Sequence, residues 1–340
     1  MPDELRAGLA LAAGAVGALA LTPVAMGVAV RTRFLDRPVG YKGHATATPY
    51  LGGAAVVSAC LIGVLIAAPS LRHVGPLAVG ALVLWAVGTA DDRVTVSPLV
   101  RVLVEIFLAA WLWLVGLGWN TGAGGLADLL VTALFIVGAV NAFNLMDNMD
   151  GTAGAVAVAA GLGVTVLALE HHDAAVAVLA AALAGACLGF LRYNLAAPAR
   201  IFLGDGGSIP VGFLLAATVM ATLHSARSGG PALVVGVVVV GLPLLDTALV
   251  VVSRTRRGVS VLTAGRDHMT HRLRTRLGTP RRVALAVGGG QAVLALAVLV
   301  AERLGPAPVY AAGVLYAVLV VMTVAKLETP PWAPRPQSSA

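Results

Sequence analysis

Long apolar runs constrain this chain more than any other feature. Eleven stretches are apolar over a length that spans, or nearly spans, a bilayer core, which takes about 20 helical residues. Isolated strands would leave backbone groups unsatisfied in lipid, so the runs predict helices. They lie at 9–30, 50–68, 76–90, 99–117, 126–143, 152–169, 174–191, 208–223, 231–252, 283–301 and 309–325, and the third and eighth are the shortest.

Composition agrees with a chain that lives in lipid. Hydrophobic residues make up 59% of the sequence and charged residues 11%, where about 25% is usual for a soluble domain. A soluble globular protein, a disordered chain and a coiled coil are thereby excluded. We expect an all-α polytopic bundle of about eleven transmembrane helices. It would form one domain over residues 1–328, followed by a Pro-rich disordered tail at 329–340.

The distribution of positive charge predicts the topology. With the N-terminus outside, nineteen of the 23 Lys and Arg residues fall in inside segments or the cytoplasmic tail. The four exceptions are Arg6, Arg72, Arg227 and Arg303. The net charge of +7 does not indicate a nucleic-acid partner, because the basic residues sit in loops between apolar runs. We therefore expect a multi-pass protein with a cytoplasmic C-terminus.

The same topology gathers the unusual polar residues on the inside face. Acids beside membrane spans are costly and mark candidate functional sites. The carboxylates would repel one another unless a cation lay among them, and Mg²⁺ is usual where phosphates are handled. The five acids are Asp91, Asp92, Asp147, Asp150 and Asp205.

Each of these motifs also has a purely structural interpretation. Asp91-Asp92 could cap the next helix or pair with Arg93. Asn141, Asn144, Asp147 and Asp150 recur every three residues, which drifts by about 60° per step round a helix, so they cannot all share one face.

Two further motifs are equally open. The run Phe202–Ser208 is a glycine turn into a helix start, whose free N–H groups could face an anion. His268, His271 and Arg272 could form a basic loop or hold a diphosphate; they make no zinc motif. For Glu105 and Asp246, a hydrogen bond within the bundle is as reasonable as a role in the site.

Together these residues resemble the polyprenyl-phosphate N-acetylhexosamine-1-phosphate transferases, membrane enzymes that start lipid-linked polysaccharide synthesis. The resemblance extends from Asp36 to about Gly278. Its motifs are Asp36-Arg37-Pro38 with His44, Pro49 and Gly52-Gly53; Gly88–Asp92; Asn141–Asp147; Asp150-Gly151; Asn194 with Pro198-Ala199; Phe202–Ser208; and His268–Arg272.

The resemblance implies a reaction and a set of roles. A polyprenyl phosphate attacks the β-phosphate of a UDP-sugar and UMP leaves. The metal would be Mg²⁺, with Mn²⁺ as an alternative, on Asn144 and Asp205. Asp91 and Asp92 would orient the lipid phosphate or take its proton, and Asp147 and Asp150 would shape the donor site. The residues expected to bind substrate are Lys42, His44, Asn194, His268, His271 and Arg272.

The resemblance also suggests a branch and a location. The spaced His268 and His271 with Arg272 resemble the N-acetylglucosamine branch; the branch that transfers a peptide-bearing muramic acid has adjacent histidines and stays an alternative. Asn148 stands where the family usually has Gly. The expected location is the plasma membrane with a cytoplasmic site. The partners would be UDP-GlcNAc, the lipid phosphate and the membrane, with a homodimer open.

Two other classes remain as alternatives. A secondary transporter would have polar residues near the bilayer midplane and paired broken helices. A CDP-alcohol phosphotransferase also carries Asp-x-x-Asp-Gly, as at Asp147–Gly151, but continues with x-x-Ala-Arg, where this chain has Gly154-Ala155.

Overall fold

The structure is a computed structural model. It describes residues 1–36, 47–226, 229–261 and 265–329. The predicted tail beyond residue 329 lies outside these ranges. Two short strands, β1 (Leu35–Asp36) and β2 (Thr48–Pro49), accompany the helices. The helices are α1 (Asp3–Arg31), α2 (Gly52–Ala67), α3 (Val74–Val94), α4 (Pro98–Leu114), α5 (Gly125–Met146), α6 (Thr152–Glu170), α7 (Ala174–Asn194), α8 (Asp205–Ala226), α9 (Gly230–Val239), α10 (Gly241–Arg256), α11 (Met269–Leu277), α12 (Pro280–Leu304) and α13 (Pro306–Leu327).

The predicted all-α membrane architecture is confirmed. Among the described residues, eight helices are long and apolar enough to cross a membrane: α1, α3, α5, α6, α7, α8, α12 and α13. The two shortest predicted runs form α3 and α8, of 21 and 22 residues, because each helix extends into polar flanking residues. The second and fourth runs form the shorter helices α2 and α4, of 16 and 17 residues.

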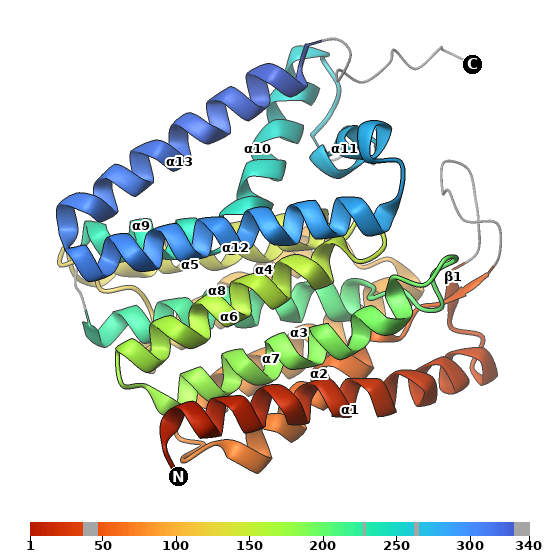
Figure 1. The fold of residues 1–340 in the computed structure, drawn as a ribbon, viewed down its shortest axis with the longest axis horizontal. Helices are drawn as coiled ribbons and strands as arrows, with labels where there is room; N and C mark the ends of the chain where they lie inside the picture. The colour runs from red at the N-terminus through yellow and green to blue at the C-terminus, as the bar shows by residue number, and fades with distance from the viewer. Residues whose placement is uncertain (37–46, 227–228, 262–264, 330–340) are drawn as a thin grey trace.

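The ninth predicted run is helical but not straight. It is divided into α9 and α10, which meet at a bend of 80°. Figure 1 shows α10 standing across the direction of the long helices. Pro243, in the first turn of α10, has no N–H to continue the helix.

A side chain from α12 satisfies the backbone at this break. Gln291 donates to the Val239 carbonyl (2.6 Å) and accepts from the Leu242 amide (3.1 Å). The Tyr316 hydroxyl of α13 donates to the Gly241 carbonyl (2.7 Å). A break at membrane depth needs such partners, because lipid supplies no hydrogen bonds.

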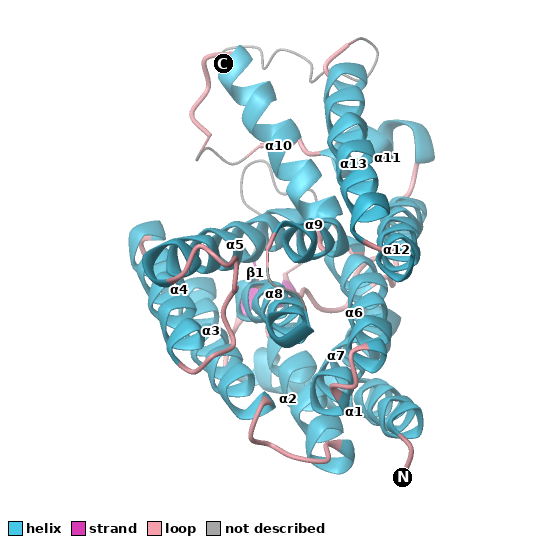
Figure 2. Cartoon of the chain, turned by 90° about the vertical axis from the view of Figure 1, so that its left-hand side faces the viewer, coloured by secondary structure: helices cyan, strands magenta, loops and turns pink. Residues whose placement is uncertain are grey.

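Helix α8 forms the centre of the bundle. The most apolar stretch of this helix is entirely buried, and Figure 2 shows α8 enclosed by its neighbours. Glycines allow the close packing: Gly80 of α3 contacts Phe213 of α8, and Gly212 of α8 contacts Phe143 of α5. Small residues at interfaces let membrane helices approach closely. The start of α8 is therefore surrounded by helix ends.

A small hairpin covers that end of the bundle. Strand β1 pairs antiparallel with β2, with Leu35 opposite Pro49. The chain after β2 then pairs with the segment before α8: Phe202 N donates to Pro49 O (2.9 Å), and Gly52 N donates to Phe202 O (3.1 Å). Figure 1 shows β1 and α11 at the same end of the molecule, the end where α1 finishes.

Candidate active site

The first turn of α8 is where the acidic motifs meet. A Cβ on Gly88 of α3 would lie 2.3 Å from the Asp205 carbonyl oxygen, and one on Gly53 of α2 would lie 2.3 Å from the Gly206 backbone. Only glycine permits both approaches. The packing brings Asp91 and Asp92, one helical turn beyond Gly88, beside Asp205.

Asp92 holds the N-terminus of α8. Its Oδ1 accepts from the Asp205 amide (2.8 Å) and its Oδ2 from the Gly206 amide (3.0 Å). The N–H groups of this turn therefore face an anion, as expected, and that anion is a carboxylate of the protein. Each oxygen of Asp92 accepts one hydrogen bond, so Asp92 positions the backbone of Asp205, and its expected catalytic role stays a prediction.

Arg101 connects Asp91 with Asp205. Its Nη1 donates to Asp91 Oδ2 (2.5 Å) and to Asp205 Oδ2 (2.9 Å). Asp91 Oδ1 accepts from the Val96 amide (2.5 Å), so both oxygens of Asp91 are also committed within the protein. Asp91 therefore positions Arg101, and its expected catalytic role stays a prediction. Sequence reasoning used Arg101 only for topology, although an arginine one turn inside a membrane helix is itself a signal of function.

Asn144 meets Asp205 on its other side. Its Nδ2 donates to Asp205 Oδ1 (2.8 Å) and to Ser208 Oγ (2.9 Å). The two residues predicted as metal ligands are thus brought together by α5 and α8. The described residues contain no group of three or more His, Cys, Asp or Glu side chains arranged to hold a metal.

The pair nevertheless fits Mg²⁺. This ion keeps several waters and uses one or two carboxylates together with substrate phosphates. Neighbouring oxygen ligands of an octahedral Mg²⁺ lie about 2.9 Å apart. The Asn144–Asp205 contact of 2.8 Å matches that separation, with the amide turned to present its oxygen. Asn144 and Asp205 are therefore the residues of this chain that would hold the ion.

The turn after α5 carries Asp147 and Asp150 beside this cluster. Burial raises the pKa of Asp147 well above its usual value, and the charges of Asp205, Asp92 and Asp150 raise it further. Among the described residues, the Asp147 carboxylate has no hydrogen-bond partner. Its two oxygens are therefore available to a ligand.

Asn194 holds the same turn in place. Its Oδ1 accepts from the Gly151 amide (2.7 Å) and its Nδ2 donates to the Ile201 carbonyl (2.9 Å). Gly151 has a φ of +78°, a conformation that glycine adopts readily, and it is the residue from which α6 begins. The Asn194 side chain is buried, with both polar groups on backbone. It positions the site, and the expected substrate contact is replaced by this role.

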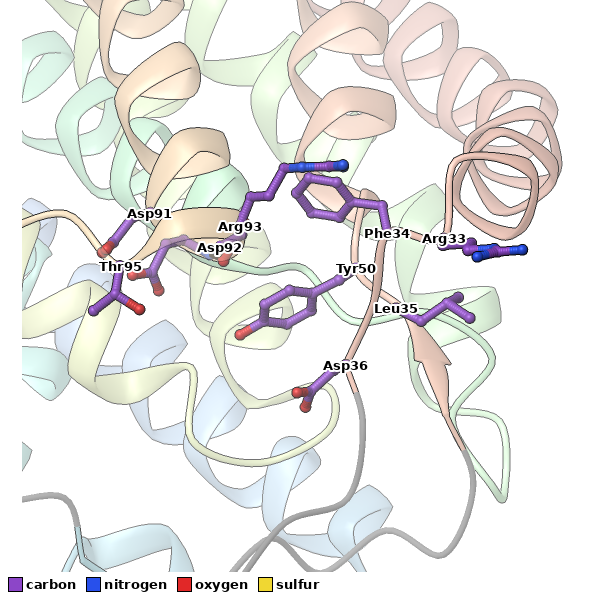
Figure 3. Close-up of a pocket in the computed structure, with 10 residues that line it drawn as sticks. Arg33, Phe34, Leu35, Asp36, Tyr50, Asp91, Asp92, Arg93 and Thr95 are labelled. Carbon is purple, nitrogen blue, oxygen red and sulfur yellow. Dashed lines mark hydrogen bonds between the residues drawn. The ribbon is translucent and has the colours of Figure 1, made fainter.

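A polar cavity of about 540 Å³ opens beside the acids. Figure 3 shows Asp91, Asp92 and Thr95 on one side of it and Arg33, Phe34 and Leu35 on the other, with Tyr50 between. Burial raises the pKa of Tyr50, and the charges of Asp92, Asp205, Asp147 and Asp36 add to this. The Tyr50 hydroxyl therefore stays protonated. The sequence carried no signal for Tyr50, which precedes the glycine pair.

The loop before α11 is built on buried ion pairs. Asp267 accepts from Arg254 Nε (2.8 Å) and Nη2 (2.9 Å) and from Arg257 Nη2 (2.7 Å). Burial alone would raise the pKa of Asp267, but the hydrogen bond and charge of Arg254 lower it to about 2. His268 Nδ1 lies 2.8 Å from Asp246 Oδ2, and Asp246 Oδ1 accepts from the Met269 amide (2.6 Å).

Two candidate intramembrane acids thus have partners inside the bundle. Asp246 holds the start of α11, and Glu105 accepts from Asn141 Nδ2 (2.6 Å). The structure therefore favours a hydrogen-bonding role within the bundle for both acids. His268 is 4% exposed, so it is committed to Asp246 and does not line the described cavity.

Arg272 does not present its guanidinium to a ligand. Nε donates to the Asp267 carbonyl (2.9 Å), Nη2 to Ser253 Oγ (2.9 Å), and Nη1 to the Leu327 carbonyl. Nη1 also pairs with Glu328 Oε1 at 2.7 Å. The residue is 3% exposed. The expected diphosphate contact is replaced by a link between α11, α10 and the end of α13.

The remaining expected binding residues have different outcomes. His271 is half-buried and stands edge-on to His268, with ring centroids 6.3 Å apart. Burial lowers its pKa to about 4, and the positive charges of His268 and Arg266 act in the same direction. His271 is therefore a neutral imidazole near pH 7. Lys42 and His44 lie outside the described residues.

The arrangement argues against a transporter. The acids lie at one end of the bundle, and one bent helix pair is found within the described ranges, where paired broken helices were expected. A cluster of carboxylates, an amide and an arginine at a helix start can instead hold phosphate groups through a cation.

Comparison with known proteins also indicates a protein that acts on phosphate groups. The model of glycosyl transferase family 4 matches residues 75–223. A decaprenyl-phosphate N-acetylglucosaminephosphotransferase of Mycobacterium leprae is 32% identical over 72% of this chain and 71% of its own length.

Two further relatives have related names. A probable undecaprenyl-phosphate N-acetylglucosaminyl 1-phosphate transferase of Bacillus subtilis is 28% identical over 80% of this chain and 79% of its own. An undecaprenyl-phosphate alpha-N-acetylglucosaminyl 1-phosphate transferase of Yersinia pestis is 27% identical over 83% and 80%. The CDP-alcohol alternative is set aside. The polar residues of α3, α5 and α8 that meet at the site all lie inside the matched region. This chain therefore belongs to glycosyl transferase family 4, and it is a multi-pass membrane phosphotransferase like its N-acetylglucosamine relatives.

Proposed function

We propose that this protein transfers GlcNAc-1-phosphate from UDP-GlcNAc to a polyprenyl phosphate and releases UMP, using Mg²⁺. The observation that carries the proposal is the convergence of Asn144, Asp205 and Arg101 on the first turn of α8. The names of the relatives supply the lipid phosphate and the transferred N-acetylglucosaminyl 1-phosphate group, and the UDP donor is the one that the family resemblance implies.

The reaction balances without a separate base. A phosphate monoester has a second pKa of about 6 and is largely dianionic at pH 7, so its oxygen is already nucleophilic. That oxygen forms a bond to the β-phosphorus of UDP-GlcNAc. The bond from the β-phosphorus to the oxygen bridging it to the α-phosphate breaks, and UMP leaves with the electron pair. This agrees with Asp91 and Asp92 being committed within the protein.

The residues of the chain position charge. Phosphoryl transfer depends chiefly on alignment and on neutralising phosphate oxygens. Bound Mg²⁺ would supply positive charge to those oxygens. Arg101 adds a fixed cation, and its Nε is buried with no hydrogen-bond partner in the described part of the chain, so it keeps a donor for a ligand. Asp92 fixes the backbone of Asp205, and Asp147 borders the same space.

We place the site on the cytoplasmic face of the plasma membrane. The positive-inside distribution supports this placement, because the loop before α11 and the ends of α3 and α5 then lie inside, where UDP-sugars occur. The homodimer stays a prediction.

A UMP exchange assay tests the function. Purified protein with decaprenyl phosphate, radiolabelled UDP-GlcNAc and Mg²⁺ should form a lipid product that excess UMP converts back to UDP-GlcNAc. Removing Mg²⁺ with EDTA should abolish both the formation of the lipid product and its conversion back to UDP-GlcNAc. Failure to label lipid with UDP-GlcNAc, while another UDP-sugar does so, would reject this donor and keep the reaction class.

A further inference from the structure

Tyr50 stands at the centre of the polar cavity in a fixed position. Its amide donates to the Phe34 carbonyl (3.2 Å), and its ring meets Phe202 edge-on, with centroids 6.1 Å apart and planes at 83°. The residues on either side pair with the segment that leads into α8, through Pro49 and Gly52. The position of the Tyr50 ring is therefore set by the same backbone that positions Asp205.

The hydroxyl of Tyr50 lies among acids and is unpaired. It shares the cavity with Asp91, Asp92 and Asp205, and Figure 3 shows the hydroxyl end of the ring directed away from Phe34 into the space between Asp92 and Asp36. Within the described ranges, this hydroxyl has no hydrogen-bond partner. A tyrosine normally ionises near pH 10, so the group is a neutral donor at pH 7.

The rest of the cavity carries charges of both signs. Arg33 and Arg93 are exposed, and the Arg93 guanidinium lies 5.6 Å from the centre of the Phe34 ring. Together with Arg101 below the acids, these cations attract phosphate, whereas the carboxylates repel it. A neutral donor between the two groups can bind a phosphate oxygen at no cost in charge, and a hydrogen bond to a charged group is worth more than one between neutral groups.

We propose that Tyr50 is a phosphate-positioning residue, whose hydroxyl donates to a phosphate oxygen of one of the two substrates in this cavity. The inference rests on the proposed transferase function and adds to it a residue that no sequence motif marked. The phosphate belongs either to the polyprenyl acceptor or to the UDP-sugar donor, and kinetics distinguish the two.

The test compares Tyr50→Phe, which removes only the hydroxyl, with Tyr50→Leu, which also removes the ring contact with Phe202. Tyr193→Phe is the matched control, because its hydroxyl donates to the Leu19 carbonyl (2.8 Å) away from the cavity. Each substrate is varied in turn. We expect Tyr50→Phe to raise the KM of one substrate by about tenfold, the size expected for a lost hydrogen bond to a charged group, with the other KM unchanged.

The outcomes divide clearly. A raised KM for decaprenyl phosphate assigns the contact to the acceptor, and a raised KM for UDP-GlcNAc assigns it to the donor; both support the proposal. If Tyr50→Phe matches the parent and only Tyr50→Leu loses activity, the residue serves packing and the proposal is overturned. A fall in kcat with both KM values unchanged overturns it as well.

A binding measurement separates this inference from the proposed function. If the parent protein has no transferase activity, the proposed function fails. Thermal shifts of the purified protein with decaprenyl phosphate and with UDP-GlcNAc then still test Tyr50. A shift that is reduced in Tyr50→Phe and kept in Tyr193→Phe supports the phosphate contact, and equal shifts in all three proteins reject it.

Discussion

Asn148 accepts a hydrogen bond from the Thr270 hydroxyl, which ties the acidic turn after α5 to the first turn of α11. The Asn148 Nδ2 donates to the Leu145 carbonyl (2.6 Å) and so also caps α5. This asparagine stands where related sequences were expected to have glycine. The structure gives it a use that glycine could not supply, since it connects two loops that are 122 residues apart.

The first prediction concerns this pair. Asn148→Gly and Thr270→Val should each raise the KM for UDP-GlcNAc by about two- to tenfold, the range of one net hydrogen bond. The double variant should be no worse than the poorer single variant, because both remove the same bond. Steady-state kinetics on all three measure this. Thr275→Val, in the same helix, is the control; additive effects would show that the residues act separately.

The second prediction concerns Asp205. Asp205→Asn removes an anionic ligand and the partner of Arg101, and should lower the Mg²⁺-dependent rate by about 10³-fold or more. Protein yield and melting temperature should change little, because the amide can still accept from Asn144. Asp173→Asn, at a helix cap elsewhere, is the control. Turnover of Asp205→Asn within tenfold of the parent would make this residue structural.

The third prediction revises the role of Arg272. Because the guanidinium is buried between Asp267, Ser253, Leu327 and Glu328, Arg272→Lys should mainly destabilise the protein and lower its melting temperature. Lysine keeps the charge but lacks the planar fork, so it cannot make all of these hydrogen bonds, and each buried acceptor left without a donor costs about 1–3 kcal/mol. Thermal unfolding in detergent measures this. Arg276→Lys, in the last turn of the same helix, is the comparison. A stable Arg272→Lys protein with a higher KM for UDP-GlcNAc would restore the direct contact.

The fourth prediction is a pH dependence from Asp267. Its pKa is about 2 in the folded protein and near 3.9 when unfolded, so the folded state favours the ionised form. Its contribution to stability is present above about pH 4 and is lost as the pH falls toward 2. The difference in melting temperature between the parent and Asp267→Asn should therefore be constant from pH 7 to 5 and shrink below pH 4. Asp3→Asn, in the exposed first turn of α1, should show no such trend.

The fifth prediction is the topology. A reporter fused after Lys326 should give a cytoplasmic signal, and one inserted in the loop Gly118–Gly125 should give an external signal. The physical reason is the retention of Lys and Arg on the inside during insertion. The reverse pair of signals would place the acids outside, where UDP-sugars are absent, and would contradict the proposed function.

The helical membrane architecture could be predicted from the chain alone, and the family motifs marked most of the residues that meet at the acidic site. Apolar length alone predicts the helices, because lipid permits few other states, and a glycine turn followed by Asp205 marks where α8 begins. The family resemblance implies that Asn144 and Asp205 hold one metal ion, and their side chains are 2.8 Å apart in the structure. What could be predicted is local in the chain: length, charge and a motif at one helix end.

The packing of distant segments determines which polar atoms remain available to a ligand. Asp92, Asn194 and Arg272 have the residue types of binding groups, but their hydrogen bonds go to backbone and side chains far away in the sequence. Arg101 and Tyr50 carried no motif, and packing places both beside Asp205. The bend at Val240 depends on Gln291, 51 positions further along. A polar side chain in a membrane protein must find a partner, and only the packing of distant helices determines whether that partner is the protein or a substrate.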